Sequence, residues 1–185
     1  MEKKSSLSIK SIVAIGIGAA LFFVLGRFVA IPSPVPNTTI NIQYGILGVF
    51  GVIYGPVVGV LVGFIGHTLI DLSWGSPWWS WIIASAAYGL IIGFAKNKIN
   101  IENGEFGKKQ IILFNLYQLA GHAIAWLLFA PSLDILIYNE PTEKLLAQGL
   151  WAGASNVITT AIIGTALLFA YAKTKTKAGS LKQEN

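Results

Sequence analysis

The fold class is decided by residues 12–26, which read IVAIGIGAALFFVLG and contain no charged side chain. They form the centre of an apolar run over residues 9–31, and a helix needs roughly 20 apolar residues to cross the hydrocarbon core of a bilayer. Further apolar runs follow at residues 40–54, 57–72, 79–94, 111–130 and 145–171. The pattern predicts an all-α polytopic membrane protein, a bundle of six transmembrane helices that forms a single membrane domain over residues 1–185.

Composition agrees with this prediction. Apolar residues make up 54% of the chain and charged residues 11%, whereas about a quarter of the residues of a soluble domain are charged. The chain has no cysteine, which excludes a disulfide framework, a thiolate metal site and a cysteine nucleophile. The first apolar run is longer than the core of a signal peptide, so we expect it to remain as the first helix.

The lysines predict the orientation. They gather at or before the start of the first run, between the fourth and fifth runs and after the last run, as Lys3, Lys4 and Lys10; Lys96, Lys98, Lys108 and Lys109; and Lys173, Lys175, Lys177 and Lys182. Short cytoplasmic loops are enriched in Lys and Arg. Six spans put all three groups on one side, so both termini are predicted to be cytoplasmic (N-in/C-in). The lysines then contact anionic lipid, and nucleic acid is not an expected partner.

The same arrangement places Lys144 and the acidic residues Asp71, Asp134, Glu140 and Glu143 on or near the opposite side of the membrane. The second and third runs are each shorter than a full span, and they could instead form a re-entrant hairpin. That alternative leaves four spans and keeps every lysine group inside, so the charge pattern does not separate the two arrangements. Both place Gln43 and Asp71 on the outer side.

Polar side chains inside a membrane are costly, so each is a candidate for function. His67 and Asp71 lie four residues apart on one helix face, where they could hold a ligand, relay protons, bind a metal or only satisfy each other. Three later runs each combine an aromatic residue with amide or hydroxyl groups in their outer halves: Trp81, Ser85 and Tyr88; Gln118, His122 and Trp126; and Gln148, Trp151, Ser155 and Thr159. Such a lining suits a flat, neutral heterocycle.

Other conspicuous residues have simpler interpretations. Trp78 and Trp79 are expected to join the aromatic belt at the membrane surface, while Trp74 suits the belt or a ligand site equally. Arg27 is expected to extend toward lipid headgroups. Small residues spaced by four in the first run let helices approach closely, either within this bundle or against a partner subunit.

The sequence contains no signature of an enzyme: no nucleophile elbow, no zinc-protease helix and no phosphate-binding glycine loop. We therefore expect no catalytic residues, no cofactor and no metal. Because the chain cannot hydrolyse ATP, active transport by it would need energy from other subunits.

Five segments resemble the substrate-capture (S) component of energy-coupling factor (ECF) transporters, closest to the riboflavin-type branch of uncharacterised membrane proteins. They are AIGIGAAL at 14–21, IPSPVPNT at 31–38, GPVVG at 55–59, GFIGH at 63–67 and GSPWWSW at 75–81. The resemblance implies six helices rather than a re-entrant hairpin. It also implies a multi-pass protein of the cell membrane, within an ABC transporter complex that includes a transmembrane coupling (T) protein and two ATP-hydrolysing subunits.

The family resemblance also implies an outer vitamin site, formed by the loop after the first helix, the loop between the third and fourth helices, and the last three helices. In the family an Ala-x-x-x-Ala motif on the first helix contacts the T protein, and Ala14 and Gly18 occupy its positions here, with glycine in place of the second alanine. The expected substrate-binding residues are Asn37, Gln43, His67, Asp71, Trp74, Trp81, Ser85, His122, Trp126, Gln148, Trp151 and Ser155.

The resemblance implies a small-molecule vitamin or precursor with a flat ring. The polar stripes contain no basic residue apart from peripheral Arg27, which disfavours a multiply anionic ligand. We therefore expect hydroxymethylpyrimidine or pyridoxine, with riboflavin next. Two alternatives remain: a proton- or metal-coupled carrier that uses His67, Asp71 and His122, and a membrane scaffold without a ligand.

Overall fold

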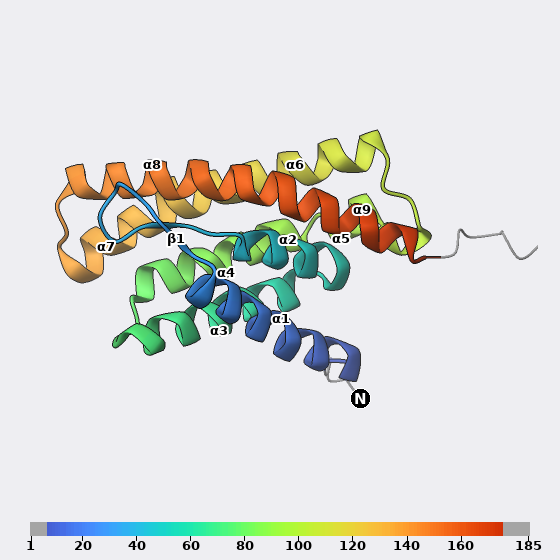
Figure 1. Ribbon diagram of the computed structural model, residues 1–185, viewed down its shortest axis with the longest axis horizontal. Coiled ribbons are helices and arrows are strands. Elements are labelled where there is room, and N and C mark those ends of the chain that lie inside the picture. Colours follow the sequence, from blue (N-terminus) through green and yellow to red (C-terminus); the bar gives the residue numbers. More distant parts are fainter. Residues whose placement is uncertain (1–6, 176–185) are drawn as a thin grey trace, which may run out of the picture.

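The computed structural model describes residues 7–175, which form a bundle of antiparallel helices (Figure 1). Its shorter helices are α1 (Ile9–Phe28), α2 (Gln43–Tyr54), α3 (Pro56–Trp74) and α4 (Trp79–Gly93). Two longer rods each contain a π-helical turn: α6 (Lys108–Ala123), η2 (Ile124–Phe129) and α7 (Ala130–Tyr138); and α8 (Thr142–Thr159), η3 (Thr160–Gly164) and α9 (Thr165–Lys173). The connections contain β1 (Ile31–Pro32), β2 (Thr39–Ile40), α5 (Lys96–Ile99) and η1 (Ile101–Asn103).

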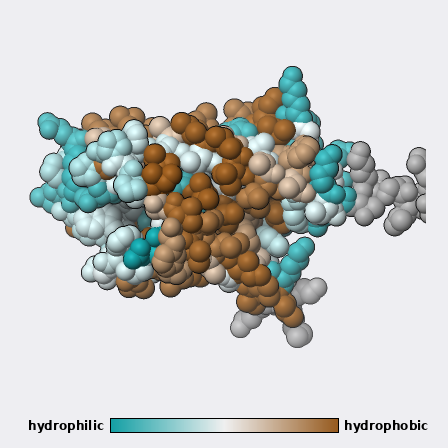
Figure 2. All heavy atoms as spheres, viewed as in Figure 1, coloured by the Kyte–Doolittle hydropathy of each residue, from teal (hydrophilic) through white to brown (hydrophobic). Residues whose placement is uncertain are grey.

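On the face seen in Figure 2, apolar residues cover the middle of the bundle, between two more polar ends. The start of α1, α5, the start of α6 and the end of α9 meet at one end, which we call the lysine end (Figure 1). It carries Lys10, Lys96, Lys98, Lys108, Lys109, Lys173 and Lys175, whereas Lys3, Lys4, Lys177 and Lys182 lie outside the described residues. The described lysines of all three groups therefore share one end, and its assignment to the cytoplasm stays a prediction.

Helix α2 is too short to cross a membrane. Its 12 residues span about 18 Å, compared with a hydrocarbon core of about 30 Å. Five other helices or rods are long and apolar enough to cross among the described residues. Helix α2 begins at Gln43 rather than at residue 40, and α1 ends at Phe28 rather than at residue 31, because the chain between them forms a hairpin.

This hairpin pairs Ile31 with Ile40 and Pro32 with Thr39 in antiparallel register. Its prolines prevent a helix, and the Gln148 side chain of α8 donates from Nε2 to the Pro36 carbonyl oxygen at 2.8 Å. The hairpin therefore covers the part of the bundle that α2 does not reach. We call this the hairpin end, and it lies opposite the lysine end (Figure 1).

The last two rods are longer than the predicted runs, because they cover 108–138 and 142–173 rather than 111–130 and 145–171. The first rod continues through Pro131, which follows the π-helical turn η2. A π-helical turn already departs from the regular hydrogen-bond pattern, so the missing N–H of a proline does less damage there. The extension adds the whole of α7 to the hairpin end.

Helices α3 and α4 cross in close contact because both carry glycine there. A Cβ on Gly59 would meet the carbonyl group of Gly89, a Cβ on Gly89 would meet that of Gly59, and a Cβ on Gly63 would meet the backbone of Ser85. This contact brings the polar outer parts of the two helices together.

The small residues of α1 divide between two faces. Ala14 and Gly18 are buried, and a Cβ on Gly18 would meet Val62 and Phe50. Gly16 and Ala20 are exposed on the surface of the bundle, away from its interior. Ala14 and Gly18 thus pack against the protein's own helices, and their expected role as a docking face stays a prediction.

The close crossing of α3 and α4 predicts that one added methyl group at the contact lowers the stability of the protein. Gly89→Ala places a Cβ against the backbone of Gly59 and should cost about 1–3 kcal/mol of stability through overpacking. The measurement is the Tm of the purified protein in detergent. Gly16→Ala is the matched control, since a Cβ there meets no atom within 4 Å; equal Tm values for the two variants would contradict the predicted overpacking.

Candidate functional site

Two adjoining cavities occupy the hairpin end. The larger has a volume of about 520 Å³ and lies between the hairpin, the start of α2 and the outer part of α3. The smaller, of about 360 Å³, continues toward α7 and the start of α8. Both are lined by Asn37, His67, Asp71 and Trp81. Each cavity lies within the usual size range of ligand sites, roughly 300–1,000 Å³.

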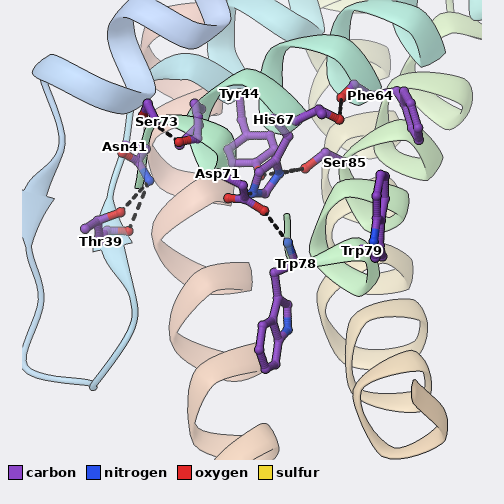
Figure 3. A network of polar contacts seen from close by, with 12 residues as sticks. Thr39, Asn41, Tyr44, Phe64, His67, Asp71, Ser73, Trp78, Trp79 and Ser85 are labelled. Atoms are coloured by element: carbon purple, nitrogen blue, oxygen red, sulfur yellow. Dashed lines mark hydrogen bonds and ion pairs between the residues drawn. The ribbon is translucent and has the colours of Figure 1, made fainter. Parts of the chain in front are cut away.

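A chain of hydrogen bonds from α2, α4 and α3 forms the floor of the cavities (Figure 3). The hydroxyl oxygen of Ser85 lies 2.8 Å from Tyr44 Oη and 2.6 Å from His67 Nδ1. His67 Nε2 lies 3.6 Å from Asp71 Oδ1. One proton arrangement points an N–H at the carboxylate: Tyr44 donates to Ser85, Ser85 donates to Nδ1, and Nε2 carries the proton. The chain thus orients His67 toward Asp71.

Asp71 also fixes the start of the next helix. Its Oδ2 atom accepts the backbone N–H of Trp78 at 2.8 Å, after a turn at Gly75 with a φ of 140° that favours glycine. The other oxygen, Oδ1, has only the 3.6 Å approach of His67. Asp71 therefore supports the loop with one oxygen and keeps accepting capacity on the other.

Asp134 on α7 is the most saturated acid of the site. Its carboxylate accepts the indole N–H of Trp78 at 2.7 Å and that of Trp81 at 3.0 Å, together with the hydroxyl of Ser80. Only 2% of the residue is exposed. Sequence reasoning missed this role because the predicted helix stopped at residue 130; the available signal was a single acid in an apolar segment together with the donors of the Trp-Trp-Ser-Trp stretch.

The same network gives Trp78 further contacts. Its ring bonds to Asp134, stacks on Tyr138 at 4.0 Å between centroids and lines the smaller cavity, while 37% of the residue is exposed, so its place in the aromatic belt stays a prediction. Trp79 is 44% exposed and stacks with Phe64. Trp79 therefore remains compatible with the belt.

His122 lies deeper in the bundle and is fully buried. Its Nδ1 atom accepts the indole N–H of Trp126 at 3.1 Å, and Nε2 lies 3.1 Å from the hydroxyl of Thr160. The ring stacks on Tyr88 with 4.0 Å between centroids. Both nitrogens are thus occupied by protein groups, and His122 supports Trp126 from behind rather than lining a cavity.

Of the predicted binding residues, those that line a cavity are Asn37, Gln43, His67, Asp71, Trp74, Trp81, Trp126 and Gln148. Ser85 and His122 stand behind this lining. Trp151 and Ser155 line neither cavity, and the Ser155 hydroxyl bonds to the Ala152 carbonyl oxygen at 3.2 Å. The lining also includes residues that were not selected from the sequence, namely Asn41, Tyr44, Asp134 and Asn156.

The family model of the ECF-type riboflavin transporter, S component, matches residues 6–173. The chain belongs to this family. As a member it is a membrane transport subunit and not an enzyme, as the sequence predicted.

Relatives of this S component bear the name UPF0397 protein. One from Streptococcus gordonii is 51% identical over 181 residues, which cover 97% of both chains. Another from Clostridium perfringens strain SM101 is 52% identical over 183 residues, covering 98% of this chain and 99% of the relative. The match extends over nearly the whole length of each.

Two solved structures share the fold of the S component. The crystal structure of FolT bound with folic acid gives a TM-score of 0.59 at 19% identity and covers 85% of this chain and 94% of its own. The S component for biotin from an ECF-type ABC transporter gives a TM-score of 0.61 at 18% identity and covers 89% and 94%. These likenesses confirm the all-α membrane fold.

The saturation of Asp134 predicts a structural role. Asp134→Ala leaves two indole N–H groups and a hydroxyl without their acceptor, so we expect a loss of roughly 2–4 kcal/mol in stability. The drop should be visible in Tm and as a red shift of the tryptophan emission. Glu143→Ala removes an exposed carboxylate from the start of α8 and should change stability by less than about 0.5 kcal/mol. A Tm for Asp134→Ala as high as that of Glu143→Ala would refute the role.

Proposed function

We propose that this S component captures a water-soluble vitamin or vitamin precursor with a flat heterocycle at the outer face of the cell membrane. The observation that carries the proposal is the pair of adjoining cavities at the hairpin end, opposite the lysine end. Aromatic rings and amides line them, and this combination provides stacking surfaces with a few placed hydrogen bonds. The capture site then opens away from the cytoplasm if the lysine end is cytoplasmic.

S components of ECF transporters work with a T component and ATPases, and we propose that this chain does so too. The T protein and two ATP-hydrolysing subunits would supply the energy, because the chain has no ATP-binding loop. The exposed small residues Gly16 and Ala20 on α1 provide a surface on which a helix of the T protein can approach closely.

For the ligand we favour hydroxymethylpyrimidine or pyridoxine, with riboflavin next. The larger cavity is lined by the rings of Tyr44, Trp74, Trp81 and Trp126. Rings on several sides suit a flat ring system held between them.

The geometry gives less support to the two alternatives. A carrier that uses His67, Asp71 and His122 would need His122 to release Trp126 or Thr160 first, and no group of three potential metal ligands occurs within residues 7–175. A scaffold without a ligand does not explain why the polar residues Gln43 and Asn156, whose buried amide oxygens have no partner among the described residues, line a cavity.

The proposed site predicts which substitutions weaken binding. Gln43→Ala or Asp71→Ala removes a polar group from the cavity wall and should cost about 1–3 kcal/mol in affinity, the usual consequence of an unmatched buried partner. Titration of purified protein with hydroxymethylpyrimidine, pyridoxine and riboflavin, followed by tryptophan fluorescence, measures this loss. Ser155→Ala, on a side chain outside both cavities, should leave affinity unchanged; full affinity in both cavity variants would move the site elsewhere.

The proposed T-protein surface predicts two kinds of variant on α1. Gly16→Trp and Ala20→Trp place a bulky ring on the exposed face and should block co-purification with the T protein, while ligand affinity and Tm stay near wild type. Gly18→Trp would instead meet Val62 and Phe50 and should lower Tm of the isolated protein. Normal assembly of both exposed-face variants would exclude this surface.

A further inference from the structure

Trp74 is the least anchored indole ring in the lining of the two cavities. The indole N–H groups of Trp78, Trp81 and Trp126 donate to side chains of the protein, whereas that of Trp74 has no such partner among the described residues. Trp74 is also 68% exposed, although it lines the larger cavity. Its ring therefore needs another contact to stay in the cavity wall.

The backbone fixes where the Trp74 side chain starts but not where its ring lies. Trp74 is the last residue of α3, and the next backbone N–H, that of Gly75, donates to the Asp71 carbonyl oxygen at 3.0 Å. A Cβ on Gly75 would meet no atom within 4 Å. The end of the helix is thus held, while the loop beside the ring is open.

Arg27, in the last turn of α1, supplies the missing contact. Its guanidinium carbon Cζ lies 3.8 Å from the centre of the Trp74 ring, well inside the range of about 6 Å over which a cation attracts the face of an aromatic ring. Arg27 takes part in none of the ion pairs of the described residues. The guanidinium is therefore free to stay on the indole, where its flat shape suits stacking.

The missing side chain of Gly26 lets this turn of α1 come close to the cavity. A Cβ on Gly26 would lie 2.5 Å from Gln43 Oε1 and would also meet the side chain of Ile70, so a larger residue there would push α1 away from α2 and α3. Gly26 lines the larger cavity, whereas Arg27 does not, because successive residues of a helix point in directions about 100° apart. Arg27 thus reaches Trp74 from beside the cavity.

We propose that Arg27 is a positioning residue of the capture site, whose guanidinium holds the Trp74 ring in the wall of the larger cavity. The inference rests on the proposed function and deepens it. Arg27 acts on a ligand through Trp74 and makes no contact of its own with it. When the guanidinium is lost, the ring can rotate away from the cavity, and a ligand loses one of its stacking surfaces.

The first test observes the Trp74 ring without a ligand. The full-length protein is labelled with 5-fluorotryptophan in lipid nanodiscs, and the fluorine NMR signal of Trp74 is identified by its absence in Trp74→Phe. Arg27→Gln should increase the broadening of this signal by a water-soluble paramagnetic chelate at least about twofold, because the ring is released. Arg27→Lys keeps a cation beside the ring and should reverse part of the increase. Equal broadening in Arg27→Gln and wild type overturns the inference.

The second test is a double-mutant cycle on ligand affinity. Wild type, Arg27→Gln, Trp74→Leu and the double variant are titrated by calorimetry with hydroxymethylpyrimidine, pyridoxine and riboflavin. For a compound that binds the wild type, Arg27→Gln should weaken affinity about twofold to thirtyfold, the range of a cation–π contact. The same change should have little effect once Trp74 has been replaced. Equal losses in both backgrounds, or no loss in either, overturn the assignment.

Lys10→Gln is the matched control for both tests. Lys10 also lies on α1, and its Nζ atom stands 5.7 Å from the centre of the Tyr54 ring, but at the lysine end. Its replacement removes the same charge and the same kind of contact, so it should change neither the Trp74 signal nor the affinity. Changes as large as those of Arg27→Gln would show a general effect of charge and overturn the positioning role.

The three compounds separate the two levels of the proposal. If one of them binds and the cycle shows no coupling between Arg27 and Trp74, vitamin capture stands and only the assignment of Arg27 fails. If none binds the wild type, the proposed function fails, and the role of Arg27 in capture fails with it.

Discussion

Backbone that is not helical can exist at membrane depth only where protein or a polar cavity satisfies its N–H and C=O groups. This constraint governs the hairpin end. Because α2 is short, the chain between α1 and α2 must cover the remaining depth without helical hydrogen bonds. The hairpin satisfies part of its backbone by pairing Ile31 with Ile40, and Gln148 satisfies the carbonyl of Pro36. The space that a longer α2 would fill becomes the larger cavity, so this cavity follows directly from the length of one helix.

The two aspartates and the two histidines around that space have different roles. The contacts of each residue determine its role. Asp134 accepts three donors and ties α7 to the start of α4, while Asp71 accepts one close donor and keeps an oxygen open. His122 has both nitrogens occupied by protein groups, whereas His67 faces the cavity lined by Asp71. The saturated members hold the walls in place, whereas His67 and Asp71 line both cavities.

The helical segments, the shared end of the lysines and the meeting of His67 with Asp71 could be predicted from sequence, because hydropathy, charge and a spacing of four are local signals. The inward face of α1 could not be predicted. This helix is apolar all round, so the pairs Ala14/Gly18 and Gly16/Ala20 look alike until neighbours are known. The same holds for Asp134, whose donors lie more than fifty positions away along the chain, a separation that no local pattern encodes.

The two π-helical turns explain how the residues beneath the larger cavity are held in place. Turn η2 contains Trp126 and turn η3 contains Thr160, and these are the two residues that bond to His122. A π-helical turn inserts one extra residue and so changes the direction in which later side chains point. The turns thus coincide with the place where both rods meet one imidazole, and Tyr88 from α4 stacks on that imidazole. Because this clamp fixes Trp126, the aromatic wall of the cavity is ordered by contacts that lie outside the cavity lining.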